Sequence, residues 1–302
     1  MQAQGGITVQ GMCELAKVSR ASFYRSWLEQ EPDAAEMAIR DEVQRVALEH
    51  RSYGYRRVKE QLRQEGVVVG AKIVRRLMRE DNLLAVRRRK FVRTTDSEHK
   101  LEIYPNLAQY LELDQVNQLW VADMTYVRLR REFVFVAVVL DAFSRRSVGW
   151  AVGRTLEATL PLAALNRAIE SRQPKPGLIH HSDKGAPYAS NLYVSRLEAI
   201  EAVPSMSRAG RPWENGACES FIKTLKAEEI DARSFASLEE LEQNIEQFME
   251  GYYNTRRLHS ALGYLSPVKF EQQQAPAPGV PWTPAKMSLP RHEEIYPDAP
   301  CK

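Results

Sequence analysis

The chain has 302 residues, a net charge of +3 and 44% hydrophobic residues, a composition typical of a globular protein of about two domains. Its three cysteines are odd in number and far apart in the sequence, which excludes a disulfide framework and indicates a reducing compartment. No signal-peptide pattern is visible, and the longest apolar run, residues 133–140, is too short to cross a bilayer. We therefore expect a cytoplasmic protein with no membrane partner.

The basic residues are unevenly distributed along the chain. Residues 51–100 hold 15 Lys or Arg and 6 Asp or Glu, a net charge of +9, against +3 for the whole chain. A basic block beside a mildly acidic remainder indicates that one module contacts nucleic acid. A solvated basic helix with no partner would give the same count, so the motifs have to decide between the two.

Residues 7–28 have the pattern of a small helix-turn-helix. A helical run at residues 12–16 is followed by a turn in which Ser19 is suited to cap the next helix. A plain helical hairpin would have the same short pattern, so DNA contact is one of two interpretations.

Residues 34–79 predict further helices. A helix is expected over residues 34–50, apolar side chains then follow the helical period at Tyr55, Val58 and Leu62, and an amphipathic helix spans residues 71–79. Arginines on the outer faces would neutralise DNA phosphates and make binding depend on salt. The candidates are Arg56, Arg57, Arg75 and Arg76.

Residues 87–111 are predicted to be a linker after a helical region at residues 1–86. The linker begins with a dense basic run that contains Arg88, Arg89 and Lys90. Such a run could lie along a DNA groove or serve as a solvated tether.

Residues 112–270 have the pattern of an α/β domain. The predicted elements, in order, are strands at 119–129, 133–140 and 147–152, a helix at 155–172, a strand at 177–180 and a helix at 191–199. Strands first, then strands alternating with helices, is the order of an RNase H-like fold. Residues 271–302 are rich in Pro, Gln and Ala, which predicts a flexible tail.

Three carboxylates in this domain lie in settings that suit metal binding. Asp123 is in the first strand, Asp183 follows a short apolar run 60 residues later, and Glu219 begins a helix-like stretch after a further 36. Two metal ions about 3.5–4 Å apart can activate a hydroxyl that attacks a phosphodiester and stabilise the oxygen that leaves. Clustered carboxylates repel one another without metal, which would raise at least one pKa.

Taken singly, each of these acids has a plainer interpretation as a strand end, a turn or a solvated helix face. A competing acid, Asp141, follows the second strand, and we predict a structural role in a turn, with a bond to Arg145. The order and spacing of Asp123, Asp183 and Glu219 together favour the metal site.

The residues around these acids resemble a known family. Residues 120–125 read Trp-Val-Ala-Asp-Met-Thr, residues 181–185 read His-Ser-Asp-Lys-Gly, and residues 215–221 read Asn-Gly-Ala-Cys-Glu-Ser-Phe. These words, with 35 residues between the second Asp and the Glu, resemble the DDE recombinases, and specifically the second-frame (OrfB-type) catalytic subunit of IS3-family insertion-sequence transposases. Residues 253–267 closely match the closing motif of that family. The chain departs from the family pattern at Pro187 and Glu214.

The resemblance implies a mixed five-stranded sheet with helices on both faces, and a DNA transposase. Asp123, Asp183 and Glu219 would hold two Mg²⁺, with Mn²⁺ as a possible substitute. The resemblance further implies supporting roles for Trp120, Thr125, His181, Asn215, Tyr253 and Asn254, and DNA contacts by Lys184, Lys223, Lys226, Arg257 and His259.

The implied partners are terminal inverted repeats and target DNA, a homo-oligomer on DNA, and a first-frame (OrfA-type) protein or a frameshift fusion with it, in association with the bacterial nucleoid. Two other functions use the same residues: a nuclease of this fold that cleaves without joining, and a DNA-binding regulator in which the acids are structural. An inactive relic has the same sequence features, although a complete triad argues against it.

Overall fold

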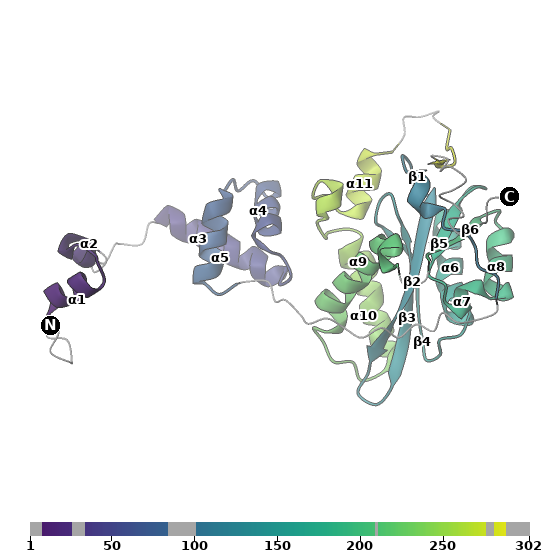
Figure 1. The fold of residues 1–302 in the computed structure, drawn as a ribbon, viewed down its shortest axis with the longest axis horizontal. Coiled ribbons are helices and arrows are strands. Elements are labelled where there is room, and N and C mark those ends of the chain that lie inside the picture. The colour runs from purple at the N-terminus through teal and green to yellow at the C-terminus, as the bar shows by residue number, and fades with distance from the viewer. Residues whose placement is uncertain (1–7, 26–33, 84–100, 209–210, 276–280, 288–302) are drawn as a thin grey trace, which may run out of the picture.

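The computed structural model describes residues 8–25, 34–83, 101–208, 211–275 and 281–287, and Figure 1 labels the main elements. The helices are α1 (Val9–Leu15), α2 (Arg20–Arg25), α3 (Ala34–Glu49), α4 (Tyr55–Gln64), α5 (Ala71–Glu80), α6 (Thr159–Arg172), α7 (Ala186–Ala189), α8 (Asn191–Glu198), α9 (Gly216–Leu225), α10 (Leu238–Glu246) and α11 (Pro267–Gln273). The strands are β1 (Leu111–Glu112), β2 (Leu119–Arg128), β3 (Phe133–Asp141), β4 (Ser147–Gly153), β5 (Ile179–Ser182), β6 (Val203–Met206) and β7 (Lys286–Met287). No helix in these ranges is long and apolar enough to cross a membrane.

The first two helices lie inside the predicted helix-turn-helix at residues 7–28. Thr8 caps α1 by accepting a hydrogen bond from Gly11 N at 3.2 Å. α2 begins directly after Ser19, whose carbonyl accepts from Phe23 N at 2.9 Å. α2 thus begins where the sequence predicts, whereas α1 begins at Val9, before the helical run predicted at residues 12–16.

Residues 34–83, here called the helical unit, contain α3, α4 and α5 around a core of their own. That core includes Val46, Val58, Leu62 and Leu77, all fully buried. The apolar period identified in the sequence is therefore the packed face of each helix.

Five strands form one mixed sheet in the order β4-β3-β2-β5-β6. β2 pairs antiparallel with β3 and parallel with β5, and β6 extends the parallel side. Antiparallel neighbours need only short turns, whereas each parallel neighbour is reached through a helix. The predicted RNase H-like fold is confirmed.

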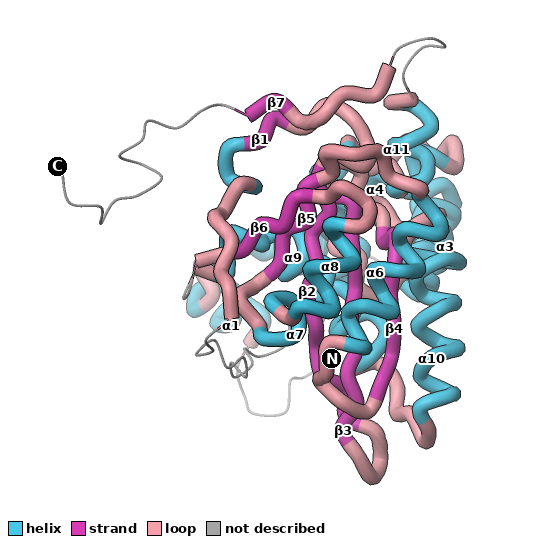
Figure 2. The backbone as a smooth tube through the Cα atoms, turned by 90° about the vertical axis from the view of Figure 1, so that its right-hand side faces the viewer, coloured by secondary structure: helices cyan, strands magenta, loops and turns pink. Residues whose placement is uncertain are grey.

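Helices cover both faces of this sheet: α9 and α10 lie on one side, and α6 and α8 on the other (Figures 1 and 2). Successive residues of β2 alternate between them. Val121 packs with Phe221 of α9, whereas Trp120 packs with Ala164 of α6. At Gly149 of β4 a Cβ atom would lie 2.2 Å from the Ala164 carbonyl oxygen, so the close approach of α6 requires a glycine there.

Of the elements predicted within residues 112–270, two differ from the prediction by two residues or more. β5 spans Ile179–Ser182 rather than residues 177–180, because Gly177 has φ +93° and belongs to the turn before the strand. α6 begins at Thr159 rather than residue 155, since its N-cap is Ala158 and the preceding residues form bends.

Residues 281–287 of the segment predicted to be a flexible tail pack against the core. Trp282 Nε1 donates to the Val116 carbonyl at 3.1 Å, and Gln118 Nε2 donates to the Thr283 carbonyl at 3.0 Å. β7 then pairs with β1. Nothing in the Pro-rich composition reveals this contact, and residues 276–280 and 288–302 lie outside the described ranges.

Candidate active site

Asp123 lies in β2 at the centre of the sheet, where it pairs with Val138 of β3. It shares a strand face with Val121, two residues before it, and Val121 packs in the core beneath α9. The carboxylate therefore lies on the α9 side of the sheet. Its Oδ1 accepts a hydrogen bond from Met124 N at 2.7 Å.

Asp183 follows β5, the parallel neighbour of β2. His181 of β5 pairs in register with Val121, so Asp183 and Asp123 both lie two residues beyond this pair. Asp183 Oδ1 accepts from Gly185 N at 2.9 Å. A Cβ atom on Gly185 would lie 2.9 Å from that same oxygen, so this turn favours glycine.

Glu219 lies in the first turn of α9, and the start of that helix is tied to β2. Asn215 Nδ2 donates to the Ala122 carbonyl at 2.9 Å, beside Asp123. Cys218 and Phe221 are buried beneath the helix, and burial raises the pKa of the Cys218 thiol far above its usual value. This cysteine anchors the helix and is not a nucleophile.

The three carboxylates act on one another electrostatically. The pKa of Asp123 is raised to about 7, first by burial and then by the negative charges of Asp183 and Glu219. The hydrogen bond from Met124 N and the charge of Lys226 oppose this rise. The pKa of Asp123 is thus raised as expected for clustered acids.

The donor set suits a hard cation, although the three groups do not yet converge. Within the described ranges, no group of three His, Cys, Asp or Glu side chains is close enough to hold an ion. Glu219 instead pairs with Lys223, whose Nζ lies 2.8 Å from Oε1 on an exposed helix face. Exposed pairs of this spacing contribute only about 0.3–0.5 kcal/mol, so rotation of Glu219 toward Asp123 and Asp183 costs little. Mg²⁺ takes oxygen ligands such as carboxylates and keeps several bound waters.

Asp141, the competing acid, has a structural role. Its fully buried carboxylate accepts from Asn117 N at 2.6 Å and Ser144 N at 2.9 Å, and Arg172 lies 3.9 Å away. The predicted bond to Arg145 was wrong. Arg145 has φ +60°, and the turn that Asp141 holds together directs its side chain elsewhere.

The chain matches protein-family models over most of its length. Two models described as integrase core domain match residues 114–212 and 201–267, and an HTH-like domain model matches residues 34–91. The 31 kDa protein of insertion element IS600 from Shigella sonnei is 35% identical over 267 residues, 87% of this chain and 98% of that protein. Transposase InsF of IS3A from Escherichia coli K12 is 31% identical over 277 residues, 89% of this chain and 96% of that protein.

The chain belongs to the IS3-family insertion-sequence transposases. The transposase for IS904 from Lactococcus lactis is a further relative, 36% identical over 78% of this chain and 93% of that protein. Among solved structures, a simian T-cell lymphotropic virus intasome aligns with TM-score 0.47 and 13% identity over 76% of this chain and 75% of that chain.

His181 of the transposase orients strands. Both ring nitrogens are engaged, Nδ1 with Ser205 Oγ at 2.8 Å and Nε2 with Ser207 Oγ at 3.1 Å. Burial lowers its pKa to about 4, so the ring is neutral and has no free nitrogen for a metal or a phosphate. This geometry agrees with a supporting role in which His181 orients the loop beside Asp183.

The other supporting residues fix the surroundings of the site. Trp120 Nε1 donates to Asn117 Oδ1 at 3.2 Å, and Thr125 is buried on the strand face of Asp123. Asn254 bonds both backbone groups of Ser147, at 2.9 and 3.0 Å. Tyr253 donates a hydrogen bond to the Arg145 carbonyl at 3.1 Å. Its ring packs edge-on against the Phe221 ring, with the two ring centres 4.6 Å apart.

The two departures from the family pattern are locally satisfied. The carboxylate of Glu214 accepts hydrogen bonds from Arg208 Nε at 2.9 Å and from Asn106 Nδ2 at 2.8 Å. Pro187 lies in the first turn of α7, where a missing N–H costs nothing.

Of the two predicted DNA contacts in the closing motif, Arg257 requires correction and His259 is uncharged. Arg257 is 4% exposed, and its Nε and Nη2 bond Glu228 at 2.8–3.1 Å, so its guanidinium is committed to a buried pair. The pKa of His259 is lowered to about 3, first by burial and then by the positive charges of Arg257, Arg57 and Arg145. His259 is therefore neutral and offers no charge to a phosphate.

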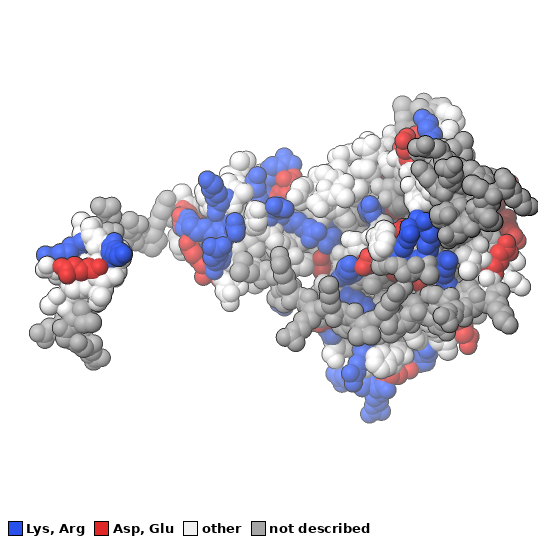
Figure 3. Space-filling view, viewed as in Figure 1, with Lys and Arg blue, Asp and Glu red and all other residues white. Residues whose placement is uncertain are grey.

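The remaining candidate DNA contacts differ in how accessible they are. Lys223 is exposed, Lys184 is half-buried, and Lys226 Nζ lies 4.4 Å from the centre of the Tyr126 ring. Among the candidates in the helical unit, Arg76 pairs with Glu36 at 2.7 Å. The other three candidates lie over tyrosine rings: Arg56 and Arg75 over Tyr55, and Arg57 over Tyr53. Arg88, Arg89 and Lys90 lie outside the described residues. Figure 3 shows Lys and Arg gathered on the visible face of the helical unit.

The helical unit also packs against the closing motif, a contact that the sequence patterns do not predict. Tyr53 Oη accepts from Leu258 N at 2.8 Å, and Leu258 is buried in the core of the helical unit. The His50 ring stacks on Tyr53 and on Tyr252, at 4.5 and 5.9 Å. Apolar and aromatic residues in both segments were the available signal, but periodicity does not say which distant segment they meet.

Proposed function

We propose that the transposase catalyses Mg²⁺-dependent cleavage and strand transfer of DNA, with Asp123, Asp183 and Glu219 as ligands of two Mg²⁺. One observation carries this proposal. Two carboxylates follow paired positions on neighbouring parallel strands, and Asn215 ties the helix of the third to the strand of the first. Such a layout would bring all three acids together on the α9 side of the sheet.

The ligand chemistry favours Mg²⁺, with Mn²⁺ as a substitute. All three groups are carboxylates, and the nearby Cys218 and His181 are buried or fully hydrogen-bonded. Hard cations prefer such oxygen ligands. Bound Mg²⁺ would polarise the attacking hydroxyl and offset the charge on the leaving oxygen.

The chain's own residues would bind and orient the DNA. When Glu219 turns toward the aspartates, it releases Lys223 to contact the DNA backbone next to the cleavage point. In the joining step a DNA 3′-hydroxyl forms a new bond to phosphorus as the bond to the old 3′-oxygen breaks. One phosphodiester replaces another, so this step needs no external energy source.

The domain organisation and partners follow the same proposal. The helical region to residue 86 and the linker at residues 87–111 would hold the terminal inverted repeats, and the core at 112–270 would carry out the reaction. Residues 271–302 would follow as a C-terminal segment, of which residues 281–287 pack on the core. Pairing of two ends requires at least two copies on DNA, and a first-frame protein, or a fusion with it, would complete end recognition.

A strand-transfer assay tests the proposal. Labelled duplex carrying the element's terminal repeat is incubated with Mg²⁺ and the wild type, Asp183→Asn, Glu219→Gln or a matched control, Glu198→Gln on α8. We expect joined product from the wild type and the control, and a loss of at least 100-fold in the two ligand variants. Nicking without joining would favour the nuclease, and joining by Asp183→Asn would refute the triad.

A further inference from the structure

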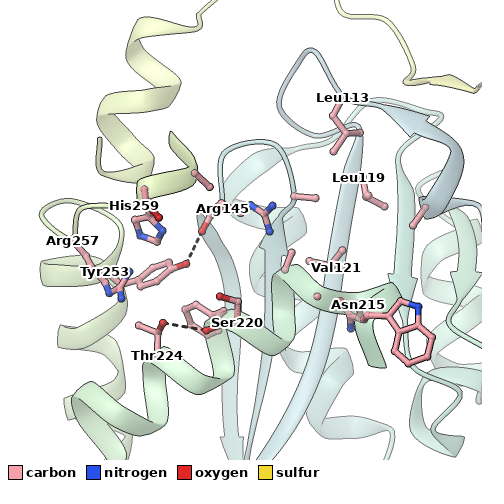
Figure 4. A pocket seen from close by; sticks show the side chains of 18 of the residues that line it. Leu113, Leu119, Val121, Arg145, Asn215, Ser220, Thr224, Tyr253, Arg257 and His259 are labelled. Atoms are coloured by element: carbon pink, nitrogen blue, oxygen red, sulfur yellow. Dashed lines mark hydrogen bonds between the residues drawn. The ribbon is translucent and has the colours of Figure 1, made fainter. Parts of the chain in front are cut away.

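A cavity of about 540 Å³ lies beside α9, between the turn after β3 and the closing motif (Figure 4). Its walls come from the helical unit, from β2, from the turn after β3 and from α9. Its volume is within the range of about 300–1,000 Å³ that is usual for small-ligand sites. Its lining includes residues of both family motifs, such as Asn215, Tyr253 and His259, but the catalytic proposal assigns no ligand to the cavity.

Arg145 points its guanidinium into this cavity (Figure 4). Its backbone has φ +60°, a conformation that few residues other than glycine adopt, and the Asp141 hydrogen bonds to Ser144 hold the turn in place. In the part of the chain that the structure describes, no carboxylate pairs with Arg145. A strained turn built on a buried acid thus presents a cation to an open cavity.

Other polar groups face the same space. His259 lines the cavity, and its Nε2 is a buried nitrogen with no hydrogen-bond partner among the described residues. Arg57 of the helical unit also lines the cavity. Glu214, the one acid in the lining, is engaged with Arg208 and Asn106, and Glu228 engages the third arginine, Arg257. The uncommitted charge is therefore positive, which suits an anion.

An exposed aromatic side chain also lines the cavity. Trp213 lines the cavity and is 67% exposed, which is unusual for so large an apolar surface. Indole faces stack on bases, and such stacking contributes about 1–3 kcal/mol per base. A cation, a free nitrogen and an exposed indole around one cavity match the phosphate and base of a nucleotide.

The cavity also lies close to the catalytic carboxylates. Ser220 and Thr224 of α9 line it, and Ser220 is one residue, or about 100° of helix rotation, from Glu219. A helix is about 10 Å across, and successive nucleotides of one strand are about 3.4 Å apart. The cavity and the carboxylate site therefore lie within about three nucleotides of each other along one strand.

We propose that this cavity binds a single nucleotide of the bound DNA strand near the reacting phosphate, with its phosphate at Arg145 and His259 and its base against Trp213. This site rests on the proposed transposase function. It would hold the strand end in place while Glu219 and the aspartates act on the neighbouring phosphate.

Binding of terminal-repeat DNA with a few unpaired end nucleotides tests the site, measured by fluorescence anisotropy over a range of salt concentrations. Arg145→Gln should weaken binding about tenfold and lower the salt slope by about one. Arg196→Gln on α8, a half-buried arginine with the same charge change, should stay within twofold of the wild type. Both variants keep a Cβ atom, so Arg145→Gln adds no new backbone strain.

A second variant fills the cavity without removing charge. A Cβ atom on Gly216 would meet nothing within 4 Å, so Gly216→Leu should fold and weaken binding by a similar factor. Neutral methylphosphonates placed one by one along the strand should weaken wild-type binding at one position and leave Arg145→Gln unaffected there.

The cavity proposal would be overturned if Arg145→Gln bound DNA with the affinity and salt slope of the wild type. It would also be overturned if Gly216→Leu left DNA binding unchanged. If strand transfer still depends on Asp183 in that case, the transposase function stands and only the cavity proposal fails. A wild type that neither binds nor joins terminal DNA would overturn both.

Discussion

Arg257 and Glu228 show how a residue that resembles a DNA contact can instead be structural. Both side chains are nearly buried, at 5% and 7% exposure, and Tyr252 adds a hydrogen bond to Glu228 at 3.1 Å. Removing one partner leaves a buried charge unpaired, which typically costs about 3–5 kcal/mol. We expect Arg257→Met to lower the free energy of unfolding by that amount in urea denaturation.

The exposed pair of Arg154 and Glu132 is the control for this prediction. Arg154→Gln should change the free energy of unfolding by less than about 1 kcal/mol, since solvent screens the pair. If Arg257→Met were as mild as Arg154→Gln and instead weakened DNA binding, the original interpretation of Arg257 as a phosphate ligand would be right.

His259 predicts a dependence of stability on pH. Its pKa is about 3 in the folded protein and about 6.5 when unfolded, so the unfolded chain binds more protons between these values. The contribution of neutral His259 to the free energy of unfolding is fully present above pH 6.5 and is lost as the pH falls toward 3. Between pH 6.5 and 5 the loss is at most about 2 kcal/mol. His259→Gln should therefore lose less stability than the wild type between pH 7 and 5 in urea titrations, and an equal loss would contradict the assignment.

At the scale of elements, local patterns locate the strands and helices but not their partners. Alternation in β2 suffices to place Asp123 on one face, and apolar spacing suffices for α3, α4 and α5. The close contact of β4 with α6 cannot be foreseen, because Gly149 is equally compatible with a turn or a bulge until Ala164 is known to lie against it. The pairing of β7 with β1 and the docking at Leu258 could not be predicted for the same reason, because each contact joins residues far apart in the chain.

Gly149 gives the element-scale prediction. Gly149→Ala places a Cβ atom 2.2 Å from the Ala164 carbonyl oxygen, so α6 must move away from β4. Overpacking of this kind costs about 1–3 kcal/mol or more, and we expect a lower thermal midpoint. Gly70→Ala, whose Cβ atom would meet nothing within 4 Å, should change it little. Equal midpoints for the two variants would mean that α6 is not packed as described.

At the scale of the whole molecule, the closing motif joins the helical unit to the catalytic core. It contributes Leu258 to the core of the helical unit and, through Arg257 and Glu228, holds the π-helical turn Lys226–Ile230 that continues α9. A single motif thus contacts both the unit proposed to hold the transposon end and the helix that carries Glu219. The position of Glu219 should therefore depend on docking of the helical unit.

Tyr53→Phe tests this dependence. The change removes the oxygen that accepts from Leu258 N, and a buried N–H without a partner costs about 1–3 kcal/mol. We expect faster hydrogen exchange at the Leu258 amide and less strand transfer, with binding of terminal DNA nearly unchanged. Tyr55→Phe is the matched control, because its hydroxyl accepts from Arg56 of the same helix, at 3.2 Å, and from no other residue in the described ranges. Faster exchange at Leu258 with full strand transfer would show that docking and the position of Glu219 are independent.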